Sequence, residues 1–230
     1  GEVTRYCHFR YVALAGGDAA VREPWRVARS YLLDAFDSVV PQGLGWHSLV
    51  PDQSVRILDA LLEKRIHTIE SSSCGRLFDA VASLIGLHQV VSFEGEDAMA
   101  LEAIADGAKE AYGFLIEGYM PLEVDMRPMV RQIVDDIERG VAKETIAARF
   151  HNTLVQVIGD VCARMREETG YQRVCLSGGC FQNLRLLRGC LQTLRSNGFE
   201  VFFQQQVPCT VGGIALGEAA IAHELMRRGL

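Results

Sequence analysis

The 230-residue sequence lacks the patterns that mark common metal and disulfide proteins. Its seven cysteines are scattered and form no CxxC pair, and its six histidines show no HxxxH or similar ligand spacing. These absences argue against a zinc site of the usual kinds. An odd number of dispersed cysteines is typical of free thiols in a reducing compartment rather than of a disulfide framework.

Basic clusters and long apolar runs are missing as well. A net charge of −6 and a pI near 5.5 leave no basic stripe for nucleic acid. No apolar run approaches the length of a membrane span, and no charged-then-apolar leader opens the chain. We therefore expect a cytoplasmic protein with neither a nucleic-acid partner nor a membrane partner.

Linkers, internal repeats and low-complexity segments are also lacking. With 49% hydrophobic residues, a chain of this length can bury a sizeable core. The alternation of apolar segments, glycine turns and helical periodicity is typical of an α/β protein. The sequence therefore predicts a single, helix-rich α/β domain over residues 1–230.

Two segments near the carboxyl end share one pattern: an apolar stretch, a Gly-Gly turn and the start of an apolar helix. They are RVCLSGGCFQN at Arg173–Asn183 and VPCTVGGIALG at Val207–Gly217. Glycine lets the backbone approach a ligand closely, and a helix start offers unpaired N–H groups that suit a phosphate. A helix over Leu184–Asn197 and a strand over Glu200–Gln204 would make this a parallel unit. The local pattern fits a nucleotide cleft, and it fits two ordinary strand-to-helix turns at least as well.

Periodicity predicts further helices and a single sheet. The helical segments are Pro24–Phe36, Pro51–Lys64, Leu77–Leu87, Ala98–Leu115, Met126–Arg139 and Lys143–Thr169. Asp52 or Ser54 is expected to cap the second of these helices. The segments expected to lie in one sheet are Glu2–Leu14, Arg173–Ser177 and Glu200–Gln204. Gly178 and Gly212 should then lie at the same edge of that sheet.

Several longer strings give the sequence a family resemblance. Besides SGGCFQN and GGIALGEAAIA, they are GGDAAVREPWR at Gly16–Arg26, SSSCGRLFDAVASLIGL at Ser71–Leu87, VSFEGEDAMALEA at Val91–Ala103 and ARFHNTL at Ala148–Leu154. In this order they resemble the carboxyl end of the HypF carbamoyltransferases, which help to mature NiFe hydrogenases. Fainter echoes occur in tRNA threonylcarbamoyl-transferring relatives, whose actin-like fold has two ribonuclease H-like lobes. The resemblance implies a helix-rich ribonuclease H-like (actin-like) lobe, the C-terminal half of a HypF-type carbamoyltransferase domain.

By this resemblance the chain is one lobe of a larger enzyme. Gly1-Glu2 resembles the end of a WGGE-like stretch, which implies that the first strand of the second lobe is absent. The first lobe, the acylphosphatase domain, the zinc-finger segment and the carbamoyl-adenylate-forming domain would be absent too. We therefore expect a fragment or a short homologue, with another chain as the possible source of the missing lobe.

The resemblance also assigns a nucleotide-binding site. The matched positions are Asp79, Gly95, Gly178, Gly179, Asn183, Gly212 and Gly213. Asp79 matches an acid that accepts ribose hydroxyls, a task that suits a carboxylate, although a solvated helix carboxylate is the commoner fate of an Asp. The Gly-Gly pairs match turns that face phosphate, and Gly95 matches a glycine on the nucleoside side. Asn183 matches a nucleotide contact, but it can instead cap the following helix.

Three further residues are candidate substrate contacts: Arg22, Arg76 and His151. Either arginine can bind the oxygens of a carbamoyl-phosphate-derived group at two points, and either can equally form a structural ion pair. His151 lies in a predicted helix, where a single histidine is more often packed or capping than a general base. We assign no catalytic residue in this chain, because the resemblance makes a thiolate of the acceptor protein the nucleophile.

One departure from the family concerns metal. The family holds a metal ion with two histidines of the first lobe and an Asp directly before the second Gly-Gly. Val211 occupies that position here, and a valine side chain has no lone pair. We therefore expect no bound metal in this chain. Glu96 and Asp97 add negative charge where the family has amide and small residues, and we expect them to repel phosphate.

The resemblance implies a function that this lobe would share with the missing parts. The full enzyme would use ATP to form carbamoyl-adenylate and pass the carbamoyl group to the C-terminal cysteine of a HypE-type acceptor, towards a cyanide ligand. The alternative is a catalytically silent remnant that binds nucleotide or another subunit. Val211 and the missing lobe favour this alternative, and we expect the isolated chain to bind ATP or AMP weakly if at all.

Overall fold

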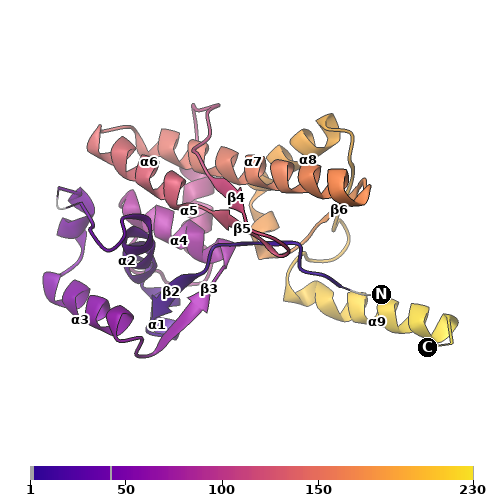
Figure 1. Cartoon of the computed structure of the whole chain (residues 1–230), viewed down its shortest axis with the longest axis horizontal. Coiled ribbons are helices and arrows are strands. Elements are labelled where there is room, and N and C mark those ends of the chain that lie inside the picture. The colour runs from indigo at the N-terminus through magenta and orange to yellow at the C-terminus, as the bar shows by residue number, and fades with distance from the viewer. Residues whose placement is uncertain (1–2, 42, 230) are drawn as a thin grey trace.

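The computed structural model describes residues 3–41 and 43–229, which form a helix-rich α/β structure (Figure 1). The predicted features at Gly1, Glu2 and Gln42 lie outside these residues. The helices are α1 Asp18–Arg22, α2 Pro24–Ala35, α3 Asp52–Glu63, α4 Cys74–Leu84, α5 Glu96–Ile104, α6 Arg127–Glu138, α7 Lys143–Thr169, α8 Leu184–Ser196 and α9 Ile214–Arg227. The strands are β1 Cys7–Phe9, β2 Val12–Ala15, β3 Thr68–Ser71, β4 Leu115–Glu117, β5 Leu122–Asp125, β6 Arg173–Leu176 and β7 Glu200–Phe203. Three short 3-10 turns complete the described elements: η1 Gly45–Leu49, η2 Gly179–Gln182 and η3 Val211–Gly213.

The strands form three small sheets, so the prediction of a single sheet is wrong. β1 pairs with β5 in parallel, β4 joins β5 antiparallel, and β2 pairs antiparallel with β3. The two N-terminal strands therefore take separate partners, with Cys7 opposite Leu122 and Val12 opposite Ser71. These partners come from β3 and β5, strands of four residues that are too short to display a reliable period and that lie far along the chain from β1 and β2.

The parallel unit at the carboxyl end is as predicted. β6 and β7 pair in parallel, from Arg173 opposite Glu200 to Leu176 opposite Phe203. The backbone N–H of Gly178 donates to the carbonyl of Cys209 at 2.9 Å, which joins the segments that follow the two strands. The two Gly-Gly turns therefore lie at the same end of this two-stranded sheet.

The core lies mainly between helices, and α2 packs against α4 at its centre. Val27, Ala28 and Leu32 on α2 and Phe78 and Val81 on α4 are almost completely buried. Ala28 and Leu32 are four residues apart and Phe78 and Val81 are three apart, which places each pair on one face of its helix. Burial of each large apolar side chain contributes about 1.5–3 kcal/mol relative to exposure.

The long helix α7 joins this core to the C-terminal part, packing against α5, α6 and α8. Phe150 of α7 meets Phe78 of α4 edge to face, with ring centroids 4.8 Å apart. α7 has the predicted bounds and ends at Gly170, whose φ of 75° is a left-handed helix stop.

Two predicted helix features are wrong. α5 ends at Ile104 rather than Leu115, because the chain turns at Asp106-Gly107, where Gly107 has a φ of 79°. The segment beyond it instead provides strand β4. The N-cap of α3 is Pro51, so Asp52 lies in the first turn, where its negative charge meets the positive end of the helix dipole.

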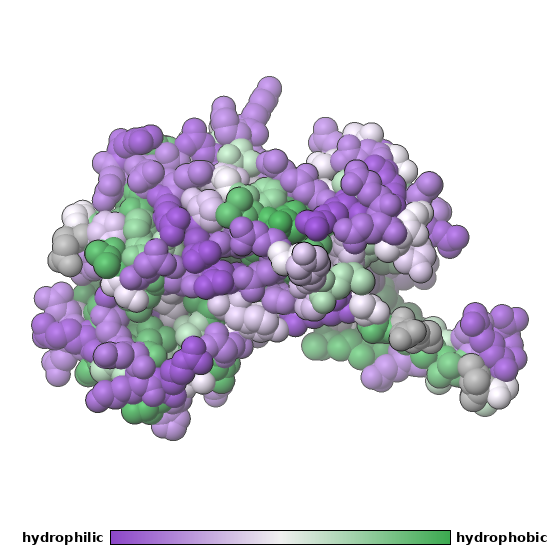
Figure 2. All heavy atoms as spheres, viewed as in Figure 1, coloured by the Kyte–Doolittle hydropathy of each residue, from purple (hydrophilic) through white to green (hydrophobic). Residues whose placement is uncertain are grey.

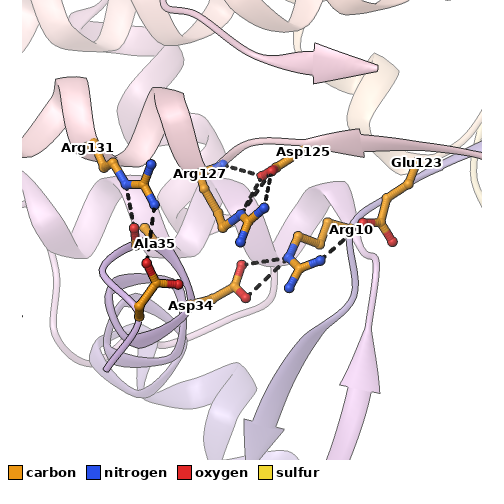
Figure 3. A network of polar contacts seen from close by, with 8 residues as sticks. Arg10, Asp34, Ala35, Glu123, Asp125, Arg127 and Arg131 are labelled. Carbon is orange, nitrogen blue, oxygen red and sulfur yellow. Dashed lines mark hydrogen bonds and ion pairs between the residues drawn. The ribbon is translucent and has the colours of Figure 1, made fainter. Parts of the chain in front are cut away.

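An ion-pair network fastens the β1–β5 sheet to α2 (Figure 3). Arg10, directly after β1, lies 3.2 Å from Asp34 of α2 and 3.2 Å from Glu123 of β5. Arg127 at the start of α6 folds back on Asp125 of β5 at 2.6 Å (Figure 3). The two pairs of Arg10 are partly exposed, so they fix the position of the sheet more than they add to stability, whereas Asp125 is buried.

The last helix, α9, projects from the body after η3 (Figure 1). Ile214, Leu216, Ile221 and Met226 are each more than half exposed, and Figure 2 shows hydrophobic residues along this helix. Within the part of the chain that the structure describes, no side chain of α9 is buried. Among the same residues, no helix combines the length and apolar character needed to cross a membrane.

Candidate functional site

The site begins at the N-terminal turn of α4. The Ser73 hydroxyl caps this helix by accepting from the backbone N–H of Arg76 at 3.4 Å. One turn on, Asp79 Oδ2 lies 2.8 Å from Arg76 Nη1. Asp79 is only 5% exposed, so it is a buried member of an ion pair rather than a solvated helix carboxylate.

Burial raises the pKa of the Asp79 carboxyl to about 7, although the Arg76 guanidinium opposes the rise. Asp79 Oδ2 and Arg76 Nη1 are both buried, and neither makes a hydrogen bond of good geometry within the described part of the chain. The start of α4 around Arg76 and Asp79, called the α4 corner below, therefore keeps unused hydrogen-bonding capacity. Such capacity is costly unless a ligand or water uses it.

Asp97 is a second buried carboxyl of this corner. Its Oδ1 lies 2.9 Å from His88 Nδ1, and burial raises its pKa to about 6 against the effect of that histidine. Its charge also contributes to the raised pKa of Asp79. The neighbouring Glu96 accepts a hydrogen bond from the backbone N–H of Ser92 at 2.6 Å. Both carboxylates that the sequence suggested would face phosphate are thus engaged within the protein.

Gly95 lies at the N-cap of α5, and its φ of 92° is left-handed. The preceding Glu94 reaches Arg76 at 3.7 Å, so the Gly95 turn lies beside the Arg76–Asp79 pair. The start of α5 therefore lies beside the start of α4. This brings Gly95 near Asp79, as expected if both belong to one site.

The first Gly-Gly turn is open. Gly178 has a φ of 109°, and a Cβ at Gly178 or Gly179 would meet no described atom within 4 Å. The turn continues into η2, which contacts α4. Cys180 of η2 is near enough to Cys74, Asp79 and Arg76 for each to affect the pKa of its thiol, the Cys74 hydrogen bond most strongly. The structure thus brings Asp79 and this turn to one corner.

Asn183 and His151 form a buried pair behind the turn. Asn183 Oδ1 accepts from the N–H of Leu186 at 2.9 Å, so Asn183 caps α8. Its Nδ2 lies 2.9 Å from His151 Nε2, and His151 Nδ1 lies 2.7 Å from the carbonyl of Ala147. Because the amide donates to Nε2, the proton is on Nδ1, and burial lowers the pKa of this neutral ring. These contacts are those of packing and capping groups.

The start of α8 is not the open anion site that the sequence suggested. Glu102 of α5 accepts from the backbone N–H groups of Leu184 at 2.8 Å and Arg185 at 3.2 Å. With Asn183 bonded to Leu186, the free donors of the first helical turn are occupied. Nothing in the sequence couples Glu102 to a helix 82 residues further on.

The second turn, Val211–Gly213, is tight, and its first residue is exposed. A Cβ on Gly213 would lie 2.3 Å from the carbonyl oxygen of Pro208, so only glycine fits there. Gly212 is less confined, with Pro208 Cγ at 3.5 Å from the same hypothetical atom. Val211, where the family resemblance led us to expect an Asp, is 81% exposed.

The Arg22 side chain makes no hydrogen bond or ion pair with this corner in the residues that the structure describes. It is an exposed residue at the end of α1, and its carbonyl accepts from the N–H of Val91 at 2.9 Å. A hollow with charged walls also lies elsewhere. About 640 Å³ in volume, it is lined by charged residues that include Arg29, Asp59 and Arg10, and by none of the predicted site residues that the structure describes. The candidate site is thus a corner formed by the starts of α4 and α5 and by the open Gly178-Gly179 turn.

Comparison with known proteins identifies relatives over almost the whole chain. Residues 1–218 match the family described as "Carbamoyltransferase, Kae1-like Domain, second subdomain". A "Carbamoyltransferase HypF homolog" of Cupriavidus necator is 31% identical over 229 residues, 96% of this chain and 58% of that protein. "Carbamoyltransferase HypF" of Rhizobium leguminosarum bv. viciae is 34% identical over 236 residues, 98% of this chain and 30% of that protein.

Solved structures show the same fold. The crystal structure of full-length HypF in the phosphate- and nucleotide-bound form matches with a TM-score of 0.88 and 36% identity, over 96% of this chain and 29% of that one. T. kodakarensis HypF matches with a TM-score of 0.77 and 26% identity, over 94% of this chain and 30% of that one. The predicted fold class is confirmed, and the chain spans from about a third to somewhat over half of these relatives.

Proposed function

The chain belongs to the HypF carbamoyltransferase family, and from that premise we propose that it forms one wall of the nucleotide site in a carbamoyl transfer reaction of hydrogenase maturation. One observation carries the proposal. The buried Asp79–Arg76 pair, with unused hydrogen-bonding capacity, shares a corner with the open Gly178-Gly179 turn. A hydroxyl-accepting acid beside an anion-accepting turn suits the two ends of a nucleotide.

In this proposal each part of the corner has a separate task. The Asp79 carboxylate accepts the ribose hydroxyls of ATP or carbamoyl-adenylate. The Gly178-Gly179 and Gly212-Gly213 turns face the phosphate and stabilise charge on the departing AMP through their remaining backbone N–H groups, since those of Gly178 and Gly213 already donate to the carbonyls of Cys209 and Thr210. A phosphate- and nucleotide-bound relative of the same fold supports the ligand class. The carbamoyl group would pass to the C-terminal thiolate of a HypE-type acceptor protein.

The other wall of the site would come from a first subdomain. The match to a "second subdomain" supports this partner, as does the small share of each relative that the chain covers. The exposed apolar residues of α9, which follow directly on the Gly212-Gly213 turn, are placed to pack against it.

Nucleotide titration tests the proposal. The isolated chain is expected to bind AMP or ATP weakly, and to bind it at micromolar Kd, about −8 kcal/mol, once mixed with the first subdomain of a complete relative. Asp79→Asn should weaken that binding by 10-fold or more, because an amide accepts ribose hydroxyls less well than a carboxylate. The matched control is Asp52→Asn at an exposed position of α3. Equal affinity of wild type and Asp79→Asn would contradict the assignment.

A second candidate is nucleotide binding or subunit contact without catalysis, and Val211 favours it. An exposed valine in the second turn provides no ligand for a cation, whereas a carboxylate there would. In the mixture with a first subdomain, Val211→Asp should raise metal content and carbamoyl transfer above the wild-type values. Metal analysis and a transfer assay measure both. Equal values would show that Val211 does not occupy the metal-ligand position.

A further inference from the structure

Asp97, the second residue of α5, is buried yet keeps one carboxyl oxygen without a partner. Its side chain is completely buried, and its Oδ1 lies 2.9 Å from His88 Nδ1. Its Oδ2 is buried as well and makes no hydrogen bond within the described part of the chain. A buried oxygen in this state costs free energy unless a donor reaches it. Asp97 Oδ2 is therefore available to a ligand.

The first turn of α5 lies against the α4 corner. Glu94, three residues before Asp97, lies 3.7 Å from Arg76, and α4 and α5 are in contact. Arg76 in turn lies 2.8 Å from Asp79. Asp97 is also near enough for its charge to contribute to the raised pKa of Asp79. Three buried polar atoms without a hydrogen bond therefore lie where the two helices begin: Asp79 Oδ2, Asp97 Oδ2 and Arg76 Nη1.

Hydroxyl groups fit these three atoms better than a cation or an anion does. An ammonium ion can donate to both carboxyl oxygens, but it has no lone pair for the guanidinium of Arg76. A phosphate can accept from the guanidinium, but it also meets two carboxylates. A hydroxyl both donates and accepts, so two hydroxyls on adjacent carbons satisfy both oxygens and offer lone pairs to Arg76 Nη1. The ligand class is therefore a vicinal diol, which the ribose of a nucleotide provides.

We propose that Asp97 divides the ribose diol with Asp79, each carboxyl accepting one hydroxyl, and that the site thereby selects ribonucleotides over deoxyribonucleotides. His88 occupies Oδ1 of Asp97, which leaves Oδ2 to the ligand. This inference rests on the proposed function, in which Asp79 faces the ribose and the Gly178-Gly179 turn faces the phosphate. Asp97 is then a sugar-binding group, whereas the sequence led us to expect that it repels phosphate.

Calorimetric titration with AMP, 2′-deoxy-AMP and 3′-deoxy-AMP tests this division. The protein is the full chain mixed with the first subdomain of a complete relative, at a pH above the raised pKa of both carboxyls. The wild type should bind each deoxy analogue about 10-fold or more weakly than AMP, because a buried charged acceptor is left unpaired. In Asp97→Asn an amide N–H group replaces Oδ2 and cannot accept, so one of the two analogues should bind as tightly as AMP. The other analogue should still bind about 10-fold more weakly than AMP.

Glu96→Gln is the matched control. It removes the same charge from the same helix start, and its amide oxygen can still accept from the backbone N–H of Ser92. This variant should therefore keep the discrimination against both deoxy analogues. If circular dichroism shows that Asp97→Asn does not fold, Asp97→Ala replaces it, because alanine removes the acceptor without adding a donor. The expected loss of discrimination against one analogue is the same.

The proposal is overturned if the Asp97 variant keeps the wild-type discrimination against both analogues, or if the wild type binds all three nucleotides equally. Either result would mean that water, and not ribose, satisfies Asp97 Oδ2. Loss of discrimination against both analogues would assign the whole diol to Asp97 and would equally overturn the division with Asp79. Failure of the proposed function gives a different result, since wild type and Asp79→Asn would then bind AMP with equal affinity. A mixture that binds no nucleotide would contradict both proposals.

Discussion

At the scale of single residues, the corner around α4 concentrates carboxyl groups that change charge near neutral pH. Burial raises the pKa of Asp79 to about 7 and that of Asp97 to about 6. Arg76 and His88 oppose these rises without cancelling them. In the proposed function Asp79 accepts the ribose hydroxyls, and its contact with Arg76 holds it in place before the ligand arrives.

The stability of the chain should therefore fall with rising pH in this range. Asp79 holds its proton up to about pH 7 in the folded state but only to about pH 4 when unfolded, so the folded state binds more protons in between. The free energy of unfolding then decreases as pH rises, by at most about 1.4 kcal/mol per pH unit from this group. Asp97 acts in the same direction over a narrower range.

Urea unfolding at pH 5 and pH 8 measures this dependence. The wild-type decrease should be smaller in Asp79→Asn, because the amide does not titrate, and unchanged in the exposed control Asp52→Asn. An equal decrease in wild type and Asp79→Asn would mean that Asp79 is already charged at pH 5.

Individual site residues were predictable only where a motif named them. Asp79 and the glycines came from strings that resemble a family, and the structure places Asp79, Gly95 and the first turn together. The roles of Asp97 and Glu102 were not predictable, because their partners depend on how α5 packs. His88 lies nine residues before Asp97, and the helix that Glu102 caps is 82 residues away. A single sequence carries no signal for such pairs.

At the scale of elements, the two Gly-Gly turns use their glycines differently. Gly178 and Gly179 face open space, which leaves their backbone accessible. Gly213 instead packs its α-carbon against the carbonyl of Pro208. The first turn is thus open on its glycine side, whereas the second is confined by the backbone of Pro208.

Alanine substitutions should distinguish the two glycines of the second turn. Gly213→Ala would place its Cβ 2.3 Å from Pro208 O, and the shift needed should cost about 1–3 kcal/mol. Gly212→Ala makes an ordinary contact of 3.5 Å and should change the unfolding free energy little. Thermal unfolding and the near-ultraviolet spectrum measure both variants. Equal stability of the two would show that this turn relaxes freely.

Long periodic elements were easier to predict than short ones. α7 was predicted with its observed bounds, because 27 residues with a regular apolar stripe and a glycine stop leave little ambiguity. β3, β4 and β5 were missed, since three or four residues cannot display a period and their partners lie far along the chain. The error in the sheet prediction follows directly, because β1 and β2 pair with those strands.

At the scale of the whole molecule, the chain has a compact helical core at one end and an apolar helix projecting at the other (Figures 1 and 2). Large apolar side chains on a projecting helix are costly in water, and a matching surface would cover them. The family match places the chain as a second subdomain, and the relatives extend well beyond the part it covers. A first subdomain is thus the partner that both observations favour.

Hydrogen exchange and association measurements test this arrangement of the molecule. Amides of Ile214–Arg227 should exchange rapidly in the isolated chain and slow at least 10-fold when the first subdomain of a complete relative is added, because packing suppresses local opening. Leu216→Asp should leave the stability of the isolated chain unchanged, since this side chain is 59% exposed, yet weaken the association by 10-fold or more. His223→Asp, an exposed polar position on the same helix, is the matched control and should associate like the wild type. If Leu216→Asp associates as tightly as the control while α9 exchange stays fast, the first subdomain binds elsewhere and the apolar face of α9 serves another contact.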